Sequence, residues 1–231
     1  MMLPVVILAG GLATRLRPLT THIPKALIEI NYEPFIAHQL RLLKAQGISE
    51  VVLCLGYLGE MVQDYLGDGS NFGIKLQYSF DGEILLGTAG SIKKALAYLP
   101  DNFFVMYGDS YLPCDFDSIQ AHFLASRKQA LMTVFQNEGQ WDKSNVEFVD
   151  GEIIKYDKVD ITPAMKYIDY GLGVFSQAAF DWVPEGSIFD LAALYQQLLA
   201  QDQLASFEVQ ERFYEIGSHS GIQEFSEYLL P

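Results

Sequence analysis

Cysteine, basic side chains and long apolar runs are all scarce in this 231-residue chain. Its two cysteines are too few for a disulfide framework and show no metal-ligand spacing. Fifteen lysines and arginines stand against 29 acidic residues, which gives a formal net charge of −14. This balance argues against nonspecific nucleic-acid binding, which needs a basic face. No apolar run approaches the roughly 20 residues that span a bilayer. We therefore expect no nucleic-acid partner and no membrane partner.

Targeting signals and two catalytic signatures are absent as well. The apolar stretch after Met1 is short and lacks a basic segment before it, so we expect no signal peptide and a cytoplasmic location. The four histidines show no H-E-x-x-H spacing, which argues against a zinc hydrolase. No G-x-S-x-G or Cys-His signature supports hydrolysis through a covalent intermediate.

The most informative segment lies near the N-terminus, where the apolar run 5–9 opens into Gly10 and Gly11. Three cations, Arg15, Arg17 and Lys25, follow within fifteen residues. Small residues at a strand end, with positive charge close by, are typical of a phosphate site. In so acidic a chain, local positive charge is what a polyphosphate ligand needs.

Two common phosphate loops do not fit this segment. A P-loop requires a glycine and then a lysine a few positions after the first glycine, where this chain has Thr14, Arg15 and Leu16. The dinucleotide fingerprint G-x-G-x-x-G also fails, because Gly11 is adjacent to Gly10 and no third glycine follows in register. The loop is therefore of a third kind.

Apolar periodicity predicts alternating strands and helices in the first half of the chain and a less regular second half. The expected helices are 34–45, 59–66, 91–99, 116–126, 191–200 and one that ends at Leu230. The expected strands are 5–9, 51–55, 74–79, 103–107, 130–136, 146–149, 153–156 and 166–175, with two short ones near Ala205 and Phe213. This order predicts one α/β domain over residues 1–231, a Rossmann-like three-layer fold with a mostly parallel mixed sheet and a small antiparallel addition.

Gly108 and Asp109 follow directly on the expected strand 103–107. In open α/β sheets ligands bind beyond the carboxyl ends of the strands, where the Gly10 loop is also expected. A carboxylate there could hold Mg²⁺, which prefers one or two carboxylates plus phosphate oxygens. The alternative is that Asp109 only caps the next turn.

The loop closely resembles the signature of sugar-1-phosphate nucleotidyltransferases, G-G-x-G-T-R-L-x-P-L-T followed by P-K. The chain reads G-G-L-A-T-R-L-R-P-L-T from Gly10, with Pro24-Lys25 beyond, so Ala13 stands at the third glycine. Alanine crowds a backbone with positive φ, whereas it fits one with negative φ. Similar segments follow over nearly the whole chain, including Leu-Gly-Thr-Ala-Gly at 86–90 and Glu215-Ile-Gly, where the family usually has aspartate.

The resemblance implies transfer of a nucleotidyl group from a nucleoside triphosphate to a sugar 1-phosphate, with Mg²⁺ as cofactor, and it leaves a homo-oligomer open. The catalytic residues it implies are Arg15, Lys25 and Asp109. The nucleotide-binding residues it implies are Leu8, Gly10, Gly11, Thr14, Arg15, Gly87, Thr88 and Gly108. The sugar phosphate-binding residues it implies are Asn145, Asp157, Lys158, Asp169 and Gly171. The metal ligands it implies are Asp109 and Glu215.

Each of these motifs also has a plain structural interpretation. Thr88 or Ser91 could cap the following helix, and Asp157 with Lys158 could be a solvated charged pair. Glu215 could be a surface acid before a helix cap at Ser218.

The resemblance also leads to an expectation about the substrates and leaves alternative functions to weigh. Chain length and motifs look most like short bacterial enzymes, and we expect GTP with a heptose or mannose 1-phosphate. A uridylyltransferase acting on N-acetylmuramic acid 1-phosphate, or a catalytically weak nucleotide-sensing relative, stays open. A Rossmann oxidoreductase is disfavoured by the failed fingerprint.

Overall fold

In the computed structural model, which describes residues 1–230, nine strands form one mixed sheet. Strands β1, β4, β5 and β6 are parallel to one another, whereas β11 runs antiparallel to β6 and β8. The main path through the sheet is β10 (Glu152–Tyr156), β9 (Val146–Val149), β11 (Tyr167–Ser176), β6 (Asn102–Tyr107), β1 (Val5–Ala9), β4 (Glu50–Leu55) and β5 (Lys75–Phe80). Strand β8 (Ala130–Gln136) pairs with β11, and β12 (Leu204–Val209) pairs with β8.

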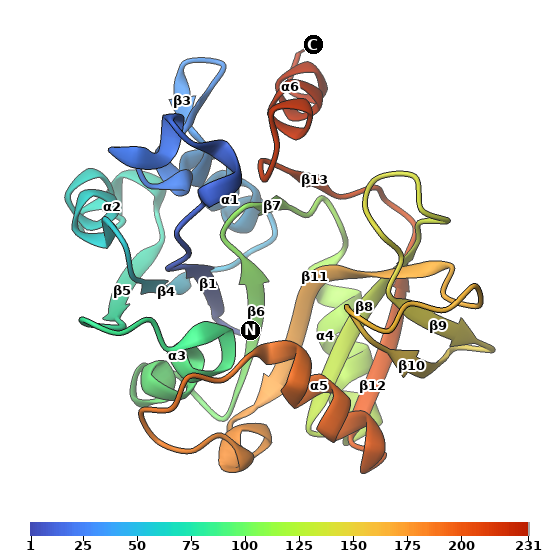
Figure 1. The fold of residues 1–231 in the computed structure, drawn as a ribbon. Helices are drawn as coiled ribbons and strands as arrows, with labels where there is room; N and C mark the ends of the chain where they lie inside the picture. Colours follow the sequence, from blue (N-terminus) through green and yellow to red (C-terminus); the bar gives the residue numbers. More distant parts are fainter. Residues whose placement is uncertain (231) are drawn as a thin grey trace.

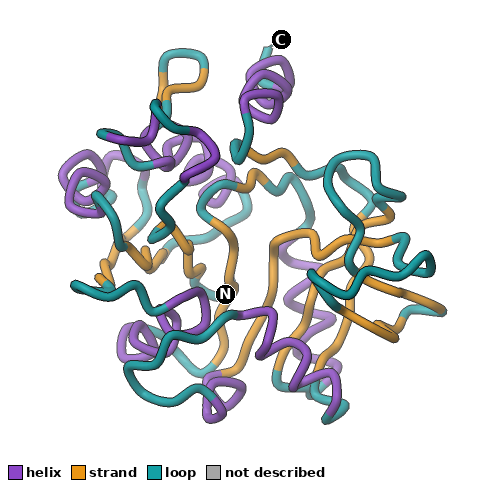
Figure 2. Tube along the Cα trace, viewed as in Figure 1, coloured by secondary structure: helices purple, strands orange, loops and turns teal. Residues whose placement is uncertain are grey.

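Helices cover both faces of this sheet (Figures 1 and 2). Strand β1 shows the reason, because Val5 and Ile7 belong to one buried cluster and Val6 belongs to the other. Alternate side chains of a strand point to opposite faces, so an all-apolar strand needs a cover on each side. One cover is α1 (Phe35–Ala45), α2 (Gly59–Leu66) and α4 (Phe116–Ser126). The other is mainly α3 (Gly87–Ala95) and α5 (Leu191–Ala200).

A third apolar cluster lies away from the sheet faces and ties the N-terminal loop to the C-terminal helix α6 (His219–Tyr228). Leu16 of the loop and Ile216, which precedes α6, are both fully buried in it. The Phe225 ring of α6 lies 5.3 Å from Phe35 and 4.7 Å from Tyr111, measured between ring centroids. Burial of each such side chain is worth about 1.5–3 kcal/mol, so this cluster holds the loop in place.

Two short antiparallel pairs complete the fold. Strand β2 (Glu29–Ile30) pairs with β3 (Glu33–Pro34), and β7 (Ser110–Tyr111) pairs with β13 (Tyr214–Glu215). The second pair joins the end of the sheet to the segment before α6, as Figure 1 shows.

The predicted fold class is confirmed, with a mostly parallel central sheet and small antiparallel additions. Helix α3 differs from its prediction, since it begins at Gly87 and ends at Ala95, with Leu96–Tyr98 in a 3-10 turn. The glycines at 87 and 90 read as a turn in the sequence, but both lie inside the first helical turns. Short elements such as β2 and β3 were not predicted, because two residues carry no periodicity. No helix among residues 1–230 is both long and apolar enough to cross a membrane.

Candidate functional site

The loop after β1 closes into a 3-10 turn, Thr14–Leu16. Ala13 stands before it in the left-handed conformation, with φ 48° and ψ 40°. The Ala13 carbonyl accepts hydrogen bonds from Thr20 Oγ1 at 2.7 Å and from the Leu16 amide at 3.2 Å. The alanine methyl therefore occupies a backbone geometry that favours glycine, at a cost of about 1 kcal/mol or more.

Two cavities meet at the carboxyl ends of β1 and β6. The first, with a volume of about 260 Å³, is lined by the Gly10 loop, Lys25 and the start of α3. The second, of about 340 Å³, is lined by residues of β11, the 142–145 segment and Glu215. Tyr107 and Asp109 line both, so Asp109 stands at their junction.

Most residues predicted to bind the nucleotide line the first cavity. They are Leu8, Gly10, Gly11, Gly87, Thr88 and Gly108, together with Lys25 and Asp109. The close approach of β1 and β6 here requires Gly108, because a Cβ on it would lie 2.7 Å from the Leu8 carbonyl oxygen. Thr14 and Arg15 were predicted for the same group, but Thr14 lines neither cavity and Arg15 lines only the second.

Lys25 and Asp109 form an ion pair, with 2.8 Å between Nζ and Oδ2. Lys25 begins the 3-10 turn Lys25–Leu27, and Asp109 follows β6, so the pair joins the loop region to the sheet. Their side chains are 18% and 25% exposed. Both charged groups are therefore partly desolvated, yet a ligand in the first cavity can still reach them. Partial desolvation makes the electrostatic interaction of each group with a charged ligand stronger than it would be in bulk water.

Pairing of β7 with β13 brings Glu215 to Asp109. Glu215 pairs with Ser110, and the Ile216 amide donates to the Asp109 carbonyl at 2.9 Å. Burial raises the pKa of the Glu215 carboxyl above its ordinary value of 4.5, and the neighbouring carboxylates Asp109 and Asp142 raise it further. Two neighbouring carboxyl groups disfavour each other's ionisation, and a nearby cation offsets that effect.

The opposing cation on this side is Arg15. A Cβ on Gly217 would lie 3.2 Å from Arg15 Nη2 and 3.3 Å from Glu215 Oε2, so both charged groups approach that glycine. A side chain at position 217 would require both groups to shift by a few tenths of an ångström. Arg15, predicted from the loop signature, thus lies beside the predicted acid of the late motif.

The residues at this junction fit Mg²⁺ when its other ligands come from substrate phosphates. The donor set is Asp109 and Glu215, two hard carboxylates, and Mg²⁺ is commonly bound by one or two carboxylates plus phosphate oxygens. Among residues 1–230 no group of three or more histidine, cysteine, aspartate or glutamate side chains is arranged to hold a metal ion. Asp109 and Glu215 alone therefore do not complete a metal site, and the remaining ligands would come from the substrate phosphates.

Four of the five predicted sugar phosphate-binding residues line the second cavity, namely Asn145, Lys158, Asp169 and Gly171. Asp169 accepts a bond from the Tyr156 hydroxyl at 3.2 Å and from the Gly171 amide at 3.1 Å. Burial raises the pKa of the Asp169 carboxyl, while the nearby Lys158 opposes that shift. Besides Lys158, this cavity is lined by the cations Arg15 and Lys143, so it offers positive charge beside the Asp169 carboxylate.

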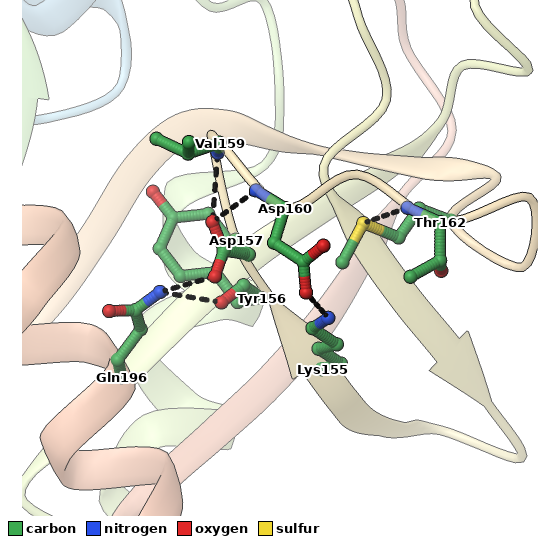
Figure 3. A network of polar contacts seen from close by, with 8 residues as sticks. Lys155, Tyr156, Asp157, Val159, Asp160, Thr162 and Gln196 are labelled. Carbon is green, nitrogen blue, oxygen red and sulfur yellow. Dashed lines mark hydrogen bonds and ion pairs between the residues drawn. The ribbon is translucent and has the colours of Figure 1, made fainter.

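Asp157, the fifth, does not line either cavity. Its carboxylate faces backbone amides of its own turn (Figure 3). The motif places Asp157 and Lys158 side by side in sequence, but their side chains point to different partners.

Asp81 is a cavity residue that the sequence reasoning did not identify. It follows β5 and lines the first cavity, where its carboxylate accepts the Leu86 amide at 3.0 Å and Ser91 Oγ at 2.7 Å. The available signal was an aspartate two positions after the end of an expected strand, as with Asp109.

The capping interpretation of Thr88 and Ser91 is wrong. Thr88 Oγ1 accepts the Leu191 amide of α5 at 2.6 Å. Ser91 Oγ lies 2.7 Å from the Gly87 carbonyl inside the helix, and its single proton is shared between that carbonyl and Asp81. Thr88 therefore ties the start of α5 to the first cavity, which local sequence could not indicate.

Three relatives resemble long stretches of the chain. It is 31% identical over 203 residues to a UTP–glucose-1-phosphate uridylyltransferase of Synechocystis, covering 80% of this chain and 52% of that protein. It is 38% identical over 115 residues to a D-glycero-alpha-D-manno-heptose 1-phosphate guanylyltransferase of Campylobacter jejuni, covering 50% and 51%. It is 27% identical over 221 residues to an N-acetylmuramate alpha-1-phosphate uridylyltransferase of Neisseria meningitidis, covering 94% of both. The chain thus spans about half the length of the first two.

A solved structure shares the fold, and a family model matches the sequence. HddC from Yersinia pseudotuberculosis has the same fold, with a TM-score of 0.83 and 23% identity over 99% of this chain and 100% of that one. The family model described as nucleotidyl transferase matches residues 4–145, which include the Gly10 loop, Lys25, the α3 segment and Asp109. These are the residues that build the first cavity, and the chain belongs to the nucleotidyl transferase family.

Proposed function

We propose that this protein transfers a nucleotidyl group from a nucleoside triphosphate to a sugar 1-phosphate and releases pyrophosphate. The observation that carries the proposal is the junction at Asp109. One cavity there is lined by six of the eight residues predicted for the nucleotide, and the adjoining cavity is lined by four of the five predicted for the sugar phosphate. A reaction between two phosphates needs such a pair of adjoining sites. Nucleoside triphosphates as substrates also support a cytoplasmic setting.

The chemistry needs no covalent intermediate on the protein. An oxygen of the sugar phosphate attacks the α-phosphorus, the new P–O bond forms, and the bond to the leaving pyrophosphate breaks with its electron pair. The nucleophile is already an anion at neutral pH, so no general base is required. The barrier is repulsion between two anions, which positioning and charge neutralisation reduce.

Three cations of this chain would share that work. Lys25, which lines the first cavity and pairs with Asp109, would neutralise the α-phosphate. Arg15 would neutralise the β and γ phosphates that leave. Lys158, in the second cavity, would hold the phosphate of the sugar. Asp109 and Glu215 would hold Mg²⁺, which when bound supplies positive charge to the phosphate oxygens.

For the substrates we propose GTP with a heptose or mannose 1-phosphate, with uridylyl transfer to N-acetylmuramic acid 1-phosphate as the alternative. The names of the Campylobacter and Neisseria relatives support these two choices. The test is a matrix of four nucleoside triphosphates against a panel of sugar 1-phosphates, with pyrophosphate release measured in the presence of Mg²⁺ and in excess EDTA. We expect one strong pair that EDTA abolishes. Absence of pyrophosphate release across the whole matrix would contradict the proposal.

A second candidate is a nucleotide-sensing relative with weak catalysis. It is favoured by Ala13, whose positive φ places a methyl in a loop position that suits glycine. Such a protein would be stabilised against thermal unfolding by a nucleoside triphosphate, since ligand binding raises apparent stability. It would release little pyrophosphate with any sugar phosphate. Thermal shift and pyrophosphate release measured on the same samples separate the two functions.

A further inference from the structure

The Asp157 carboxylate binds the backbone of the turn that follows β10, and a second carboxylate, that of Asp160, pairs with Lys155 (Figure 3). Asp157 Oδ1 accepts hydrogen bonds from the Val159 amide at 2.8 Å and from the Asp160 amide at 2.9 Å. The Asp157 amide donates to the Asn145 carbonyl at 3.0 Å. A short polar side chain that binds amides two and three residues ahead fixes the backbone between them. The residues enclosed by that turn are Lys158 and Val159.

A glutamine from a distant helix ties the turn to the core. Gln196 of α5 donates through Nε2 to the Tyr156 carbonyl at 3.1 Å and to Asp157 Oδ2 at 3.3 Å, as Figure 3 shows. Helix α5 is anchored by the fully buried Leu194 and Leu198. Gln196 itself lines neither cavity. The turn therefore takes its position from a rigid element on the side away from the substrates.

Lys158 is the group whose position depends on this turn. Its Nζ lies 3.4 Å from the Tyr107 hydroxyl and 5.3 Å from the centre of that ring. Among residues 1–230 no carboxylate lies within 4 Å of it. A lysine with four flexible carbons and no ion-pair partner has much rotamer freedom to lose when it binds a phosphate. Fixing its backbone and resting it on Tyr107 reduces that loss before substrate arrives.

We propose that Asp157 and Gln196 are positioning residues, which act on the sugar phosphate only through Lys158. The inference rests on the function proposed above and departs from the prediction that Asp157 itself contacts the sugar phosphate. Asp157 already accepts three hydrogen bonds. A second carboxylate facing a phosphate would also add repulsion, whereas one that holds the turn adds none at the phosphate.

The test measures the KM for the sugar 1-phosphate and for the nucleoside triphosphate separately. We expect D157A and Q196L each to raise the sugar-phosphate KM by about fivefold to tenfold, the size of a lost cap, with little change in the nucleotide KM. D157N should recover most of the loss, because its amide oxygen can still accept both backbone amides. The matched control is D115A, which removes a carboxylate that binds the Asp117 and Ser118 amides at the start of α4. It should lower stability and leave both KM values unchanged.

A double-mutant cycle separates positioning from contact. If Asp157 acts only through Lys158, D157A should add nothing to the sugar-phosphate KM in a K158M background. A full additional effect there would overturn the proposal in favour of direct contact. A D157N variant as impaired as D157A would overturn it as well, because charge rather than the turn would then be responsible.

Amide hydrogen exchange keeps the test independent of activity. Exchange at Val159 and Asp160 should be faster in D157A and near normal in D157N. Unchanged exchange in D157A would refute the structural half of the inference, whatever the enzyme does. If the wild-type protein released no pyrophosphate with any substrate pair, the proposed function would be refuted. The hydrogen-exchange result would still show whether Asp157 holds the backbone of the turn.

Discussion

Replacement of Lys25 by methionine tests the junction between the two cavities most directly. Methionine keeps most of the length and apolar volume of the lysine stem and removes the ammonium. Asp109 then loses its 2.8 Å partner and stays beside the like charge of Glu215. The structure and the chemistry of the site predict effects of very different size on stability and on turnover.

The expected change in stability is small. The pair is partly exposed, at 18% and 25%, and ion pairs in contact with solvent contribute roughly 0.2–1 kcal/mol. For a chain of this length that is a shift in Tm of at most about 4 °C. Turnover should fall much further, by about 10²–10³-fold, because a preorganised donor aimed at developing charge is worth about 2.7–4 kcal/mol.

The assay measures kcat and KM for both substrates by pyrophosphate release, with Tm on the same preparations. A matched control is K75M, which removes an exposed pair with Glu50 at 3.7 Å and with side chains 64% and 51% exposed. It should leave turnover unchanged. Near-normal turnover in K25M, at a Tm that shows an intact fold, would refute the role given to Lys25. A Tm lowered by ten degrees or more would show instead that the pair is mainly structural.

Three further predictions concern the loop, the late acid and the 137–145 segment. A13G should raise the free energy of unfolding by about 0.5–1 kcal/mol, because glycine adopts the positive φ of residue 13 without a Cβ clash. Part of that gain is lost to the greater entropy of the unfolded glycine chain. Denaturant unfolding measures the change, and a destabilised A13G variant would contradict the backbone strain inferred at residue 13. E215Q should be more stable than wild type at pH 7 and should lose that advantage as the pH falls toward 4.5, because a carboxyl with a raised pKa stabilises the fold only while protonated. Tm against pH measures this, and Mg²⁺-dependent turnover should drop in the same variant. The Arg212 guanidinium carbon lies 3.4 Å from the centre of the Trp141 ring. R212M removes this cation–π contact, so the fluorescence emission of Trp141, measured in a W182F background, should shift to the red. An unchanged spectrum would show that the contact between Arg212 and Trp141 does not hold the 137–145 segment.

Much of the fold could be predicted because its longer elements have strong local periodicity. Strand β1 and helices α2, α4 and α5 have the bounds that their apolar patterns predict. Helix α3 was predicted four residues late, since glycine at 87 and 90 disfavours a helix by propensity. There, packing of Gly87 and Gly90 against the 187–189 backbone decides the conformation, and a Cβ at either position would lie within 2.7 Å of a carbonyl oxygen.

The candidate site divides in the same way. The loop signature, Lys25 and Asp109 are recognisable because each lies at a strand end or within a spaced motif, and the chain places them around one cavity. The sequence around Asp157 does not indicate its role, because an aspartate beside a lysine is the same pattern whether its carboxylate binds a substrate or a backbone amide. Only the contacts of its turn, and the arrival of Gln196 from α5, distinguish the two.

The sequence by itself determined the alternation of strands and helices, the kind of phosphate loop and the family resemblance, because these depend on neighbours within a few positions. The tertiary structure alone decided which charges meet. Lys25 reaches Asp109 across 84 positions, and Glu215 reaches it only because β13 pairs with β7. Such contacts come from burial of the apolar cluster around Phe225 and from strand pairing. These are gains of the whole chain, which no local pattern records.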